Sequence, residues 1–117
     1  MIYTSKLVLH NAQAQLRVTE PRPTFYVGAN PTDVLLVRFK SDPKDNDRTL
    51  TIGKAMFFPY WSDVKQYIDP EDAVPTDFEK LPSGYYKVTP KQPLQLGEYA
   101  FLREGGGAGR AYDFGRE

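Results

Sequence analysis

The chain has 117 residues, its 15 lysine and arginine residues balance 15 aspartate and glutamate residues, and it contains no cysteine. This length fits one core, so we expect residues 1–117 to form a single domain. The balanced charge argues against nucleic acid and anionic lipid as partners, and the lack of cysteine excludes disulfides, thiol catalysis and cysteine-based zinc sites.

Short runs of alternating apolar and polar residues follow one another along the chain, bounded by Pro, Gly, Asn or Asp, and this period of 2 is typical of half-buried strands. In chain order the candidate strands are KLVLHN, AQLRVTE, PTFYVGA, DVLLVRFKS, RTLTIGKAMFF, GYYKVTP, GEYAFLRE and RAYDFG. We expect DVLLVRF, the most apolar of them, at the centre of a sheet. The turn chemistry of SDPKDNDR predicts a hairpin that joins it to TLTIG.

Residues 59–80 interrupt this pattern, because they show no sustained period of 2. Four residues that precede Pro70 are spaced to allow one or two helical turns, namely Trp61, Val64, Tyr67 and Ile68. We therefore interpret the segment as a long connection with room for one short helix within 60–75.

The pattern Leu-x-x-Gly-x-Tyr occurs twice, as Leu81, Gly84 and Tyr86 and again as Leu94, Gly97 and Tyr99. In Greek-key sandwiches, a tyrosine near the start of a strand can bury its ring and donate a hydrogen bond to the preceding corner. We assign this structural tyrosine corner to the second copy, where the leucine fills the core and the glycine permits a close backbone approach. The first copy would begin the preceding strand in the same way.

These residues give the chain a resemblance to immunoglobulin-like or fibronectin-type modules of bacterial exported proteins, through LPSGYYKVTPKQPLQLGEYAFL and the closing YDFG. More narrowly, the run from RPTFYVG through DVLLVRF to YDFG is similar to uncharacterised domains of secreted bacterial proteins. The resemblance implies an all-β fold, an immunoglobulin-like antiparallel β-sandwich of about seven to nine strands with Greek-key connections. It implies no known activity.

We find no convincing catalytic constellation in the sequence. The glycines within 105–109 lack the Lys-Ser/Thr of a phosphate loop and favour a hairpin tip, and the DFG at 113–115 lacks the other parts of a kinase. His10 lies at a predicted strand end, and the sequence contains no Gly-x-Ser-x-Gly nucleophile elbow whose serine it could activate. The acidic runs at 42–47 and 69–79 lack the glycine and distal glutamate of an EF-hand and favour solvated turns. We therefore expect no enzyme, no catalytic residue, no cofactor and no metal site.

The segment MFFPYWSDVKQY carries the strongest functional signal, because it crowds aromatic residues at a predicted strand end, among them Phe58, Tyr60, Trp61 and Tyr67. Alternation buries about half of such a run, and exposed rings make strong contacts at low entropic cost. Three interpretations stay open: a loop whose rings cap the core, a protein-binding surface, and a platform that stacks on sugar rings.

The sequence thus predicts a non-enzymatic accessory or protein-interaction module of a bacterial, exported protein. The alternative is a small carbohydrate-binding module that uses the loop around Tyr60 and Trp61. Self-association through lightly charged edges of the first and last strands is a further expectation.

Two observations bear on location. The chain shows no signal-peptide pattern and nothing near the roughly 20 apolar residues of a membrane helix, so we expect no membrane insertion. We expect a cytoplasmic protein if Met1 is the native start, and a secreted or periplasmic one if the chain is an excised domain.

Overall fold

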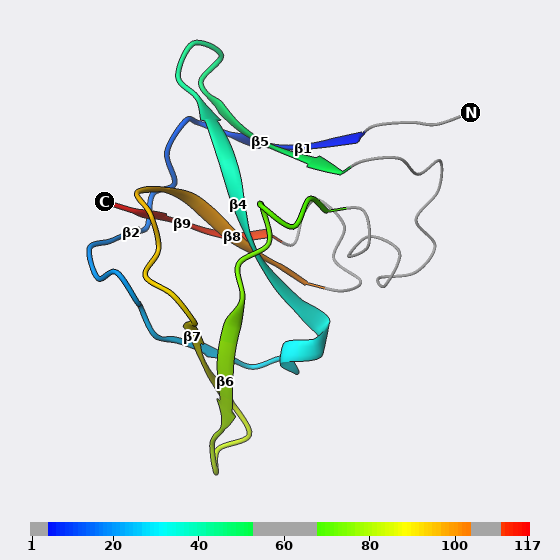
Figure 1. Ribbon diagram of the computed structural model, residues 1–117, viewed down its shortest axis with the longest axis vertical. Coiled ribbons are helices and arrows are strands. Elements are labelled where there is room, and N and C mark those ends of the chain that lie inside the picture. The colour runs from blue at the N-terminus through cyan, green and yellow to red at the C-terminus, as the bar shows by residue number, and fades with distance from the viewer. Residues whose placement is uncertain (1–4, 53–67, 104–110) are drawn as a thin grey trace.

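The computed structural model describes residues 5–52, 68–103 and 111–117, which form an all-β fold of nine strands and one short 3-10 helix. The strands are β1 (Ser5–His10), β2 (Arg17–Val18), β3 (Phe25–Val27), β4 (Val34–Asp42), β5 (Asp47–Ile52), β6 (Thr76–Lys80), β7 (Tyr86–Pro90), β8 (Gly97–Arg103) and β9 (Ala111–Arg116), with the helix η1 at Pro31–Asp33. One sheet has the order β1-β5-β4-β8-β9-β2 and the other the order β3-β7-β6 (Figure 1). The predicted all-β sandwich is confirmed.

Strand β4 lies at the centre of the larger sheet, as its apolar sequence predicts. Residues Val34–Phe39 pair with β8, and Lys40–Asp42 pair with β5. The predicted hairpin between β4 and β5 is confirmed by the pairing of Asp42 with Asp47. In its turn, the Asp42 carboxylate accepts the Lys44 N–H at 3.1 Å, and Asn46 takes the left-handed conformation with a φ of 52°.

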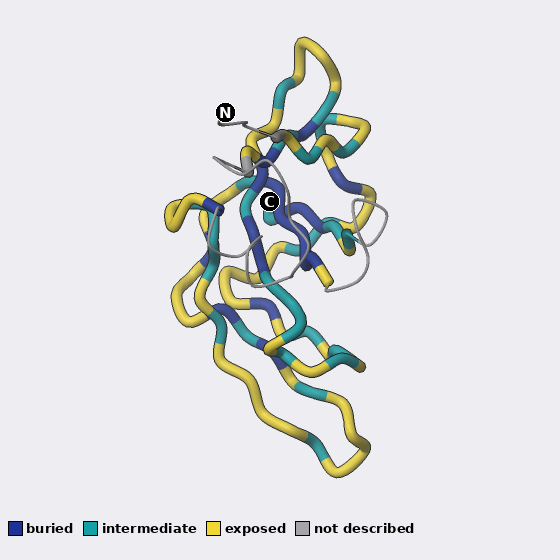
Figure 2. Tube along the Cα trace, turned by 90° about the vertical axis from the view of Figure 1, so that its right-hand side faces the viewer, coloured by how far each residue is buried: buried dark blue, intermediate teal, exposed yellow. Residues whose placement is uncertain are grey.

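Strands β4 and β8 bury side chains on both faces. One face contributes Leu36, Tyr99 and Phe101 to a largely aromatic cluster that packs against β3 and β7. The other face contributes Val37 and Ala100 to a largely aliphatic cluster with β5 and Ile68. Burial on both sides requires a continuous apolar run instead of alternation, which explains the LLV of β4 and the AFL of β8. Figure 2 shows this buried centre in dark blue.

Residues 72–74 connect the two sheets. The Arg38 N–H donates to the Asp72 carbonyl at 2.8 Å, and the Val74 N–H donates to the Leu36 carbonyl at 2.9 Å. The chain then enters β6, and the β6–β7 hairpin projects from one end of the long axis while the β4–β5 turn projects from the other (Figure 1).

Two sequence predictions about strands are wrong. AQLRVTE forms only the two-residue β2, which is parallel to β9, because the chain leaves the sheet where the Ala14 N–H donates to the Glu98 carboxylate at 2.7 Å. Thr76–Lys80, interpreted as part of a connection, forms β6. This strand shows no apolar period because every residue after Thr76 is exposed.

The prediction that the first and last strands form edges of a sheet holds only in part. β1 lies at the edge of its sheet, but the last two paired residues of β9 have β2 beside them. For the predicted helix within 60–75, residues 60–67 lie outside the described residues, and 68–75 contain no helix. The glycines of 105–109 also lie outside the described residues. No helix in the described part of the chain is long and apolar enough to cross a membrane.

Candidate functional site

A cleft of about 420 Å³ opens at one end of the space between the two sheets. Residues 25–29, which comprise β3 and the turn after it, form one side, and Val34, Phe101, Arg103 and Tyr112 form the other. Its volume lies within the range of about 300–1,000 Å³ that is typical of binding pockets. The cleft is therefore large enough to hold part of a ligand.

The cross-strand register of β8 and β9 makes the cleft aromatic. Tyr99 lies opposite Phe114, and Phe101 lies opposite Tyr112, so four rings share the face that looks toward the smaller sheet. Phe114 is 1% exposed, whereas Tyr112 is 53% exposed. The aromatic core thus continues without a break into a solvent-facing wall of the cleft.

Phe25 from the opposite sheet completes the apolar floor. Its ring centroid lies 5.0 Å from that of Phe101 in an edge arrangement and 4.7 Å from that of Phe114. Aromatic pairs at such distances are stabilising beyond the area they bury. The floor is consequently packed before any ligand arrives.

Arg103, the last residue of β8, is the only charged residue among the described residues that line the cleft. Its side chain makes no hydrogen bond or ion pair that the structure records with the described residues. Arg17, by contrast, pairs with Glu98 at 2.8 Å, and Arg48 pairs with Asp113 at 2.7 Å. The cleft therefore combines an apolar, aromatic surface with one exposed positive charge.

Titratable groups with perturbed pKa values lie elsewhere among the described residues. Repulsion by Asp42 raises the pKa of Asp45, and burial raises the pKa values of Asp72 and Tyr99. None of these residues lines the cleft. In the same part of the chain, no three His, Asp or Glu side chains are grouped to hold a metal ion. Among the described residues, the groups with perturbed pKa values therefore lie away from the cleft.

The aromatic surface predicted from sequence, Phe58, Tyr60, Trp61 and Tyr67, lies outside the described residues and stays a prediction. His10 is exposed at the end of β1.

The second copy of the repeated pattern lies at the start of β8, at the end of the strand that is far from Arg103. Leu94 is buried in the aromatic cluster. A Cβ on Gly97 would lie 3.1 Å from the Arg38 guanidinium, so a larger residue would crowd it. The Tyr99 hydroxyl donates to the Gln95 carbonyl at 2.8 Å. This hydrogen bond joins β8 to the segment that precedes it. That these residues form the tyrosine corner of immunoglobulin-like domains stays a prediction.

The first copy has a different local structure. The Gly84 N–H donates to the Leu81 carbonyl at 3.0 Å, and Gly84 has a φ of 92°, which glycine adopts without strain. These residues form the turn of the β6–β7 hairpin, and Tyr86 begins β7. Both copies precede or begin strands, but only the second one turns from one sheet into the other.

Sequence reasoning did not find the cleft. Its members come from three distant stretches, and each one reads as an ordinary strand residue. The one available signal is the run of same-face residues Tyr99, Phe101 and Arg103, because a charge at the end of an aromatic face marks the place where the core reaches solvent.

Comparisons of the chain with protein-family models, with curated proteins and with solved structures find no match.

Proposed function

We propose that this chain is a non-enzymatic protein-interaction module that binds a partner polypeptide in the cleft between β3 and the ends of β8 and β9. The observation that carries the proposal is the pairing of exposed aromatic rings with an exposed arginine. Tyr26 and Tyr112 are 64% and 53% exposed at the same cleft as Arg103. Tyrosine and arginine are enriched among the residues that contribute most to protein interfaces.

The packed floor supports the same function. Phe25 and Phe101 already contact each other, and strands β4 and β8 hold the wall in register. A preorganised surface loses little conformational entropy when a partner binds, so affinity requires fewer new contacts. The lining residues that the structure describes include no carboxylate, histidine, serine or threonine that could act as a nucleophile or base. We accordingly infer binding without turnover.

The setting of this module in a bacterial exported protein is part of the proposal and is supported by the sequence resemblance. The carbohydrate alternative is supported by the aromatic segment with Tyr60 and Trp61, which lies outside the described residues. Both alternatives can be separated by one binding experiment.

The experiment compares the wild type with Tyr112→Ser and with Leu96→Ser on an array of random synthetic peptides and on a panel of polysaccharides. Leu96 is a matched control, because it is 63% exposed and precedes the far end of β8. We expect peptides that bind the wild type and the Leu96→Ser variant but not the Tyr112→Ser variant. Near-ultraviolet circular dichroism verifies that both variants fold.

Two results would contradict the proposal. Peptide binding that is absent, or that both substitutions leave unchanged, would remove the cleft as the binding surface. Binding of a polysaccharide that Tyr112→Ser abolishes would instead assign the cleft to carbohydrate.

A further inference from the structure

The first observation concerns the edge of β3. This strand pairs with β7 through Phe25–Val88, Tyr26–Lys87 and Val27–Tyr86, and within the described ranges it is the last strand on its side of the smaller sheet. An edge strand leaves every second backbone N–H and C=O without a partner in the sheet. No residue of β7 or β6 lines the cleft, whereas all of β3 does. The cleft therefore runs along the unpaired edge of β3.

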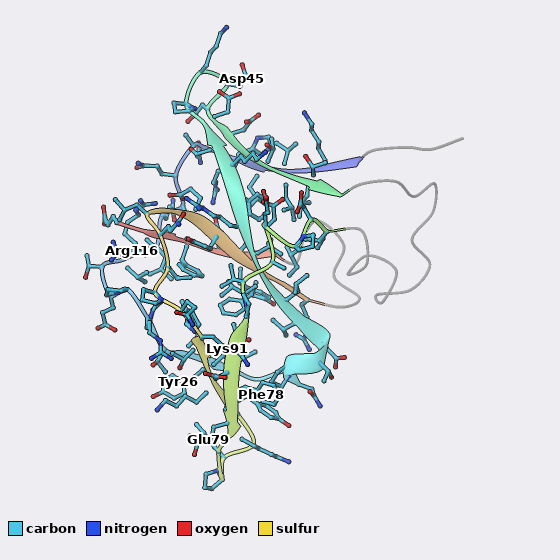
Figure 3. The ribbon with its side chains drawn as sticks, in the orientation of Figure 1. Tyr26, Asp45, Phe78, Glu79, Lys91 and Arg116 are labelled. Carbon is cyan, nitrogen blue, oxygen red and sulfur yellow. The ribbon has the colours of Figure 1, made fainter. Side chains whose placement is uncertain are left out.

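The opposite edge of the same sheet differs in charge. β6 has the sequence TDFEK, and its exposed residues include Asp77, Glu79 and Lys80. Charged side chains on an edge strand discourage pairing with another chain. β3 has the sequence FYV and carries no charge. Figure 3 shows Tyr26 and Phe78 at opposite margins of this sheet, so a protected edge and an unprotected edge lie on its two sides.

The third observation is the charge of the cleft. Every other arginine that the structure describes has a recorded side-chain partner, and Arg103 has none among the described residues. A guanidinium presents a planar fork of donors that matches a carboxylate with two hydrogen bonds. An apolar wall beside it excludes water and strengthens such a pair.

Together, these observations indicate the chemical class of the partner. We infer that the cleft binds an extended peptide segment that adds to the edge of β3 as a further strand and places a carboxylate on Arg103. Backbone hydrogen bonds to β3 supply part of the affinity, and alternate side chains of the peptide enter the aromatic floor, as in strand addition generally. This inference rests on the proposed function and specifies its partner.

The test uses a defined set of synthetic octapeptides. Each alternates threonine with valine around one central phenylalanine, and a single aspartate is moved through every position. Each peptide has one twin with asparagine in place of aspartate and two twins with N-methyl groups on alternate amides, one on the odd and one on the even positions. N-methylation removes the donors of one edge of the peptide and leaves its side chains unchanged.

Binding is measured by NMR titration of isotope-labelled protein, as the wild type, as Arg103→Gln and as Lys44→Gln. Lys44 is the control because it is an exposed cation in the β4–β5 turn, away from the cleft, and its loss changes the net charge equally. We expect at least one aspartate peptide to shift the amide signals of Phe25–Val27. It should bind about tenfold more tightly than its asparagine twin, as a charge-assisted hydrogen bond implies.

Arg103→Gln should abolish that difference, whereas Lys44→Gln should keep it. One of the two N-methylated twins should lose binding, because strand addition uses only one edge of the peptide. Equal affinities of the aspartate and asparagine twins in the wild type would overturn the inference. So would amide shifts confined to β6 or to the β1 edge.

The remaining outcomes separate the inference from the proposed function. If both N-methylated twins bind as well as the parent peptide, strand addition is wrong, although the cleft still binds peptides. If light scattering shows a dimer that Arg103→Gln dissociates, the occupant is a second copy of this chain and the inference is wrong. If no peptide of this set or of the random array binds with a dissociation constant below about 1 mM, both proposals fall.

Discussion

The two ends of the β8–β9 pair have the same antiparallel pairing and differ in the segments that contact them. At the closed end, β2 pairs with Gly115 and Arg116 of β9, and the segment before β2 donates a hydrogen bond to Glu98 of β8. At the open end, Phe101, Arg103 and Tyr112 face the cleft. Glu98 lies on the face of β8 opposite to the aromatic one, so the two ends differ in the segments that contact them and not in the aromatic face that runs through both.

The contacts at the closed end are largely electrostatic. One carboxylate oxygen of Glu98 accepts the Ala14 N–H at 2.7 Å, and the other pairs with Arg17 at 2.8 Å. The Arg17 guanidinium lies against Gly115, where a Cβ would clash with it. These contacts fasten β2 and the segment before it to β8, beside the pairing of β2 with β9. We therefore expect stability to depend on the closed end and binding on the open end.

Glu98→Gln should have the largest effect on stability. Glu98 is 4% exposed, so neutralising it leaves the partly buried Arg17 with only the longer, more exposed ion pair to Glu117 at 3.7 Å. Breaking a buried pair in this way typically costs several kcal/mol, and we expect about 3 kcal/mol from urea unfolding. Glu79→Gln on the exposed β6 is the matched control and should change the free energy of unfolding by less than about 0.5 kcal/mol. Equal effects of the two substitutions would show that the closed end is not stabilised by this pair.

Phe25→Ala and Phe78→Ala compare two phenylalanines that flank the same residue, since both are registered opposite Val88. Phe25 contacts Phe101 and Phe114, whereas Phe78 is 56% exposed and its recorded ring contact is with Tyr86. We expect Phe25→Ala to lower the free energy of unfolding by about 2 kcal/mol and Phe78→Ala by less than about 1 kcal/mol. Chemical denaturation of both variants under one condition tests this order, and a reversed order would mean that the core does not extend to the cleft as described.

Tyr99→Phe should have a smaller effect, because it removes one hydrogen bond and keeps the ring. The Tyr99 hydroxyl donates to Gln95 at 2.8 Å, and loss of such a bond costs about 1 kcal/mol. Burial also raises the pKa of Tyr99 above its ordinary value of 10.0. The unfolded chain therefore loses this proton first, and the contribution of Tyr99 to stability is present below pH 10 and declines as the pH rises through the higher folded pKa.

The difference in free energy of unfolding between the wild type and Tyr99→Phe should consequently shrink between about pH 9 and about pH 11. Denaturant titrations at a series of pH values measure it, and the subtraction cancels the titration of the other tyrosines and of the lysines. A difference that is constant over this range would mean that Tyr99 ionises equally in the folded and unfolded chain.

Strands were predicted correctly where burial produces either an alternating or a continuously apolar sequence. β4 and β8 are apolar because both of their faces are covered, and the turn after β4 has the residues that its geometry requires. β6 has no such signal, because four of its five residues are exposed. β2 is shorter than predicted because a distant carboxylate, that of Glu98, takes the Ala14 N–H. A side chain that is 84 positions away cannot be inferred from local alternation.

The cleft was missed for a related reason. Its residues become neighbours only through the register of β8 with β9 and through the approach of Phe25 from the other sheet. Alternation indicates which face of a strand is apolar, but not where the opposite sheet stops covering it. The predicted aromatic surface at Tyr60 and Trp61 belongs to a segment outside the described residues, so it neither supports nor replaces the cleft.

Tyr112→Ser should have the smallest effect on stability, although its ring belongs to the same aromatic face as Phe114. Tyr112 is 53% exposed, and no hydrogen bond of its hydroxyl to the described residues is recorded, so we expect the free energy of unfolding to change by less than about 1 kcal/mol. Thermal unfolding, followed with the peptide-array measurement on the same preparation, tests both properties at once. A loss of peptide binding without a loss of stability would assign binding to the open end of β8 and β9 and stability to the closed end. A stability loss as large as that of Glu98→Gln would instead mean that the open end is part of the structural core.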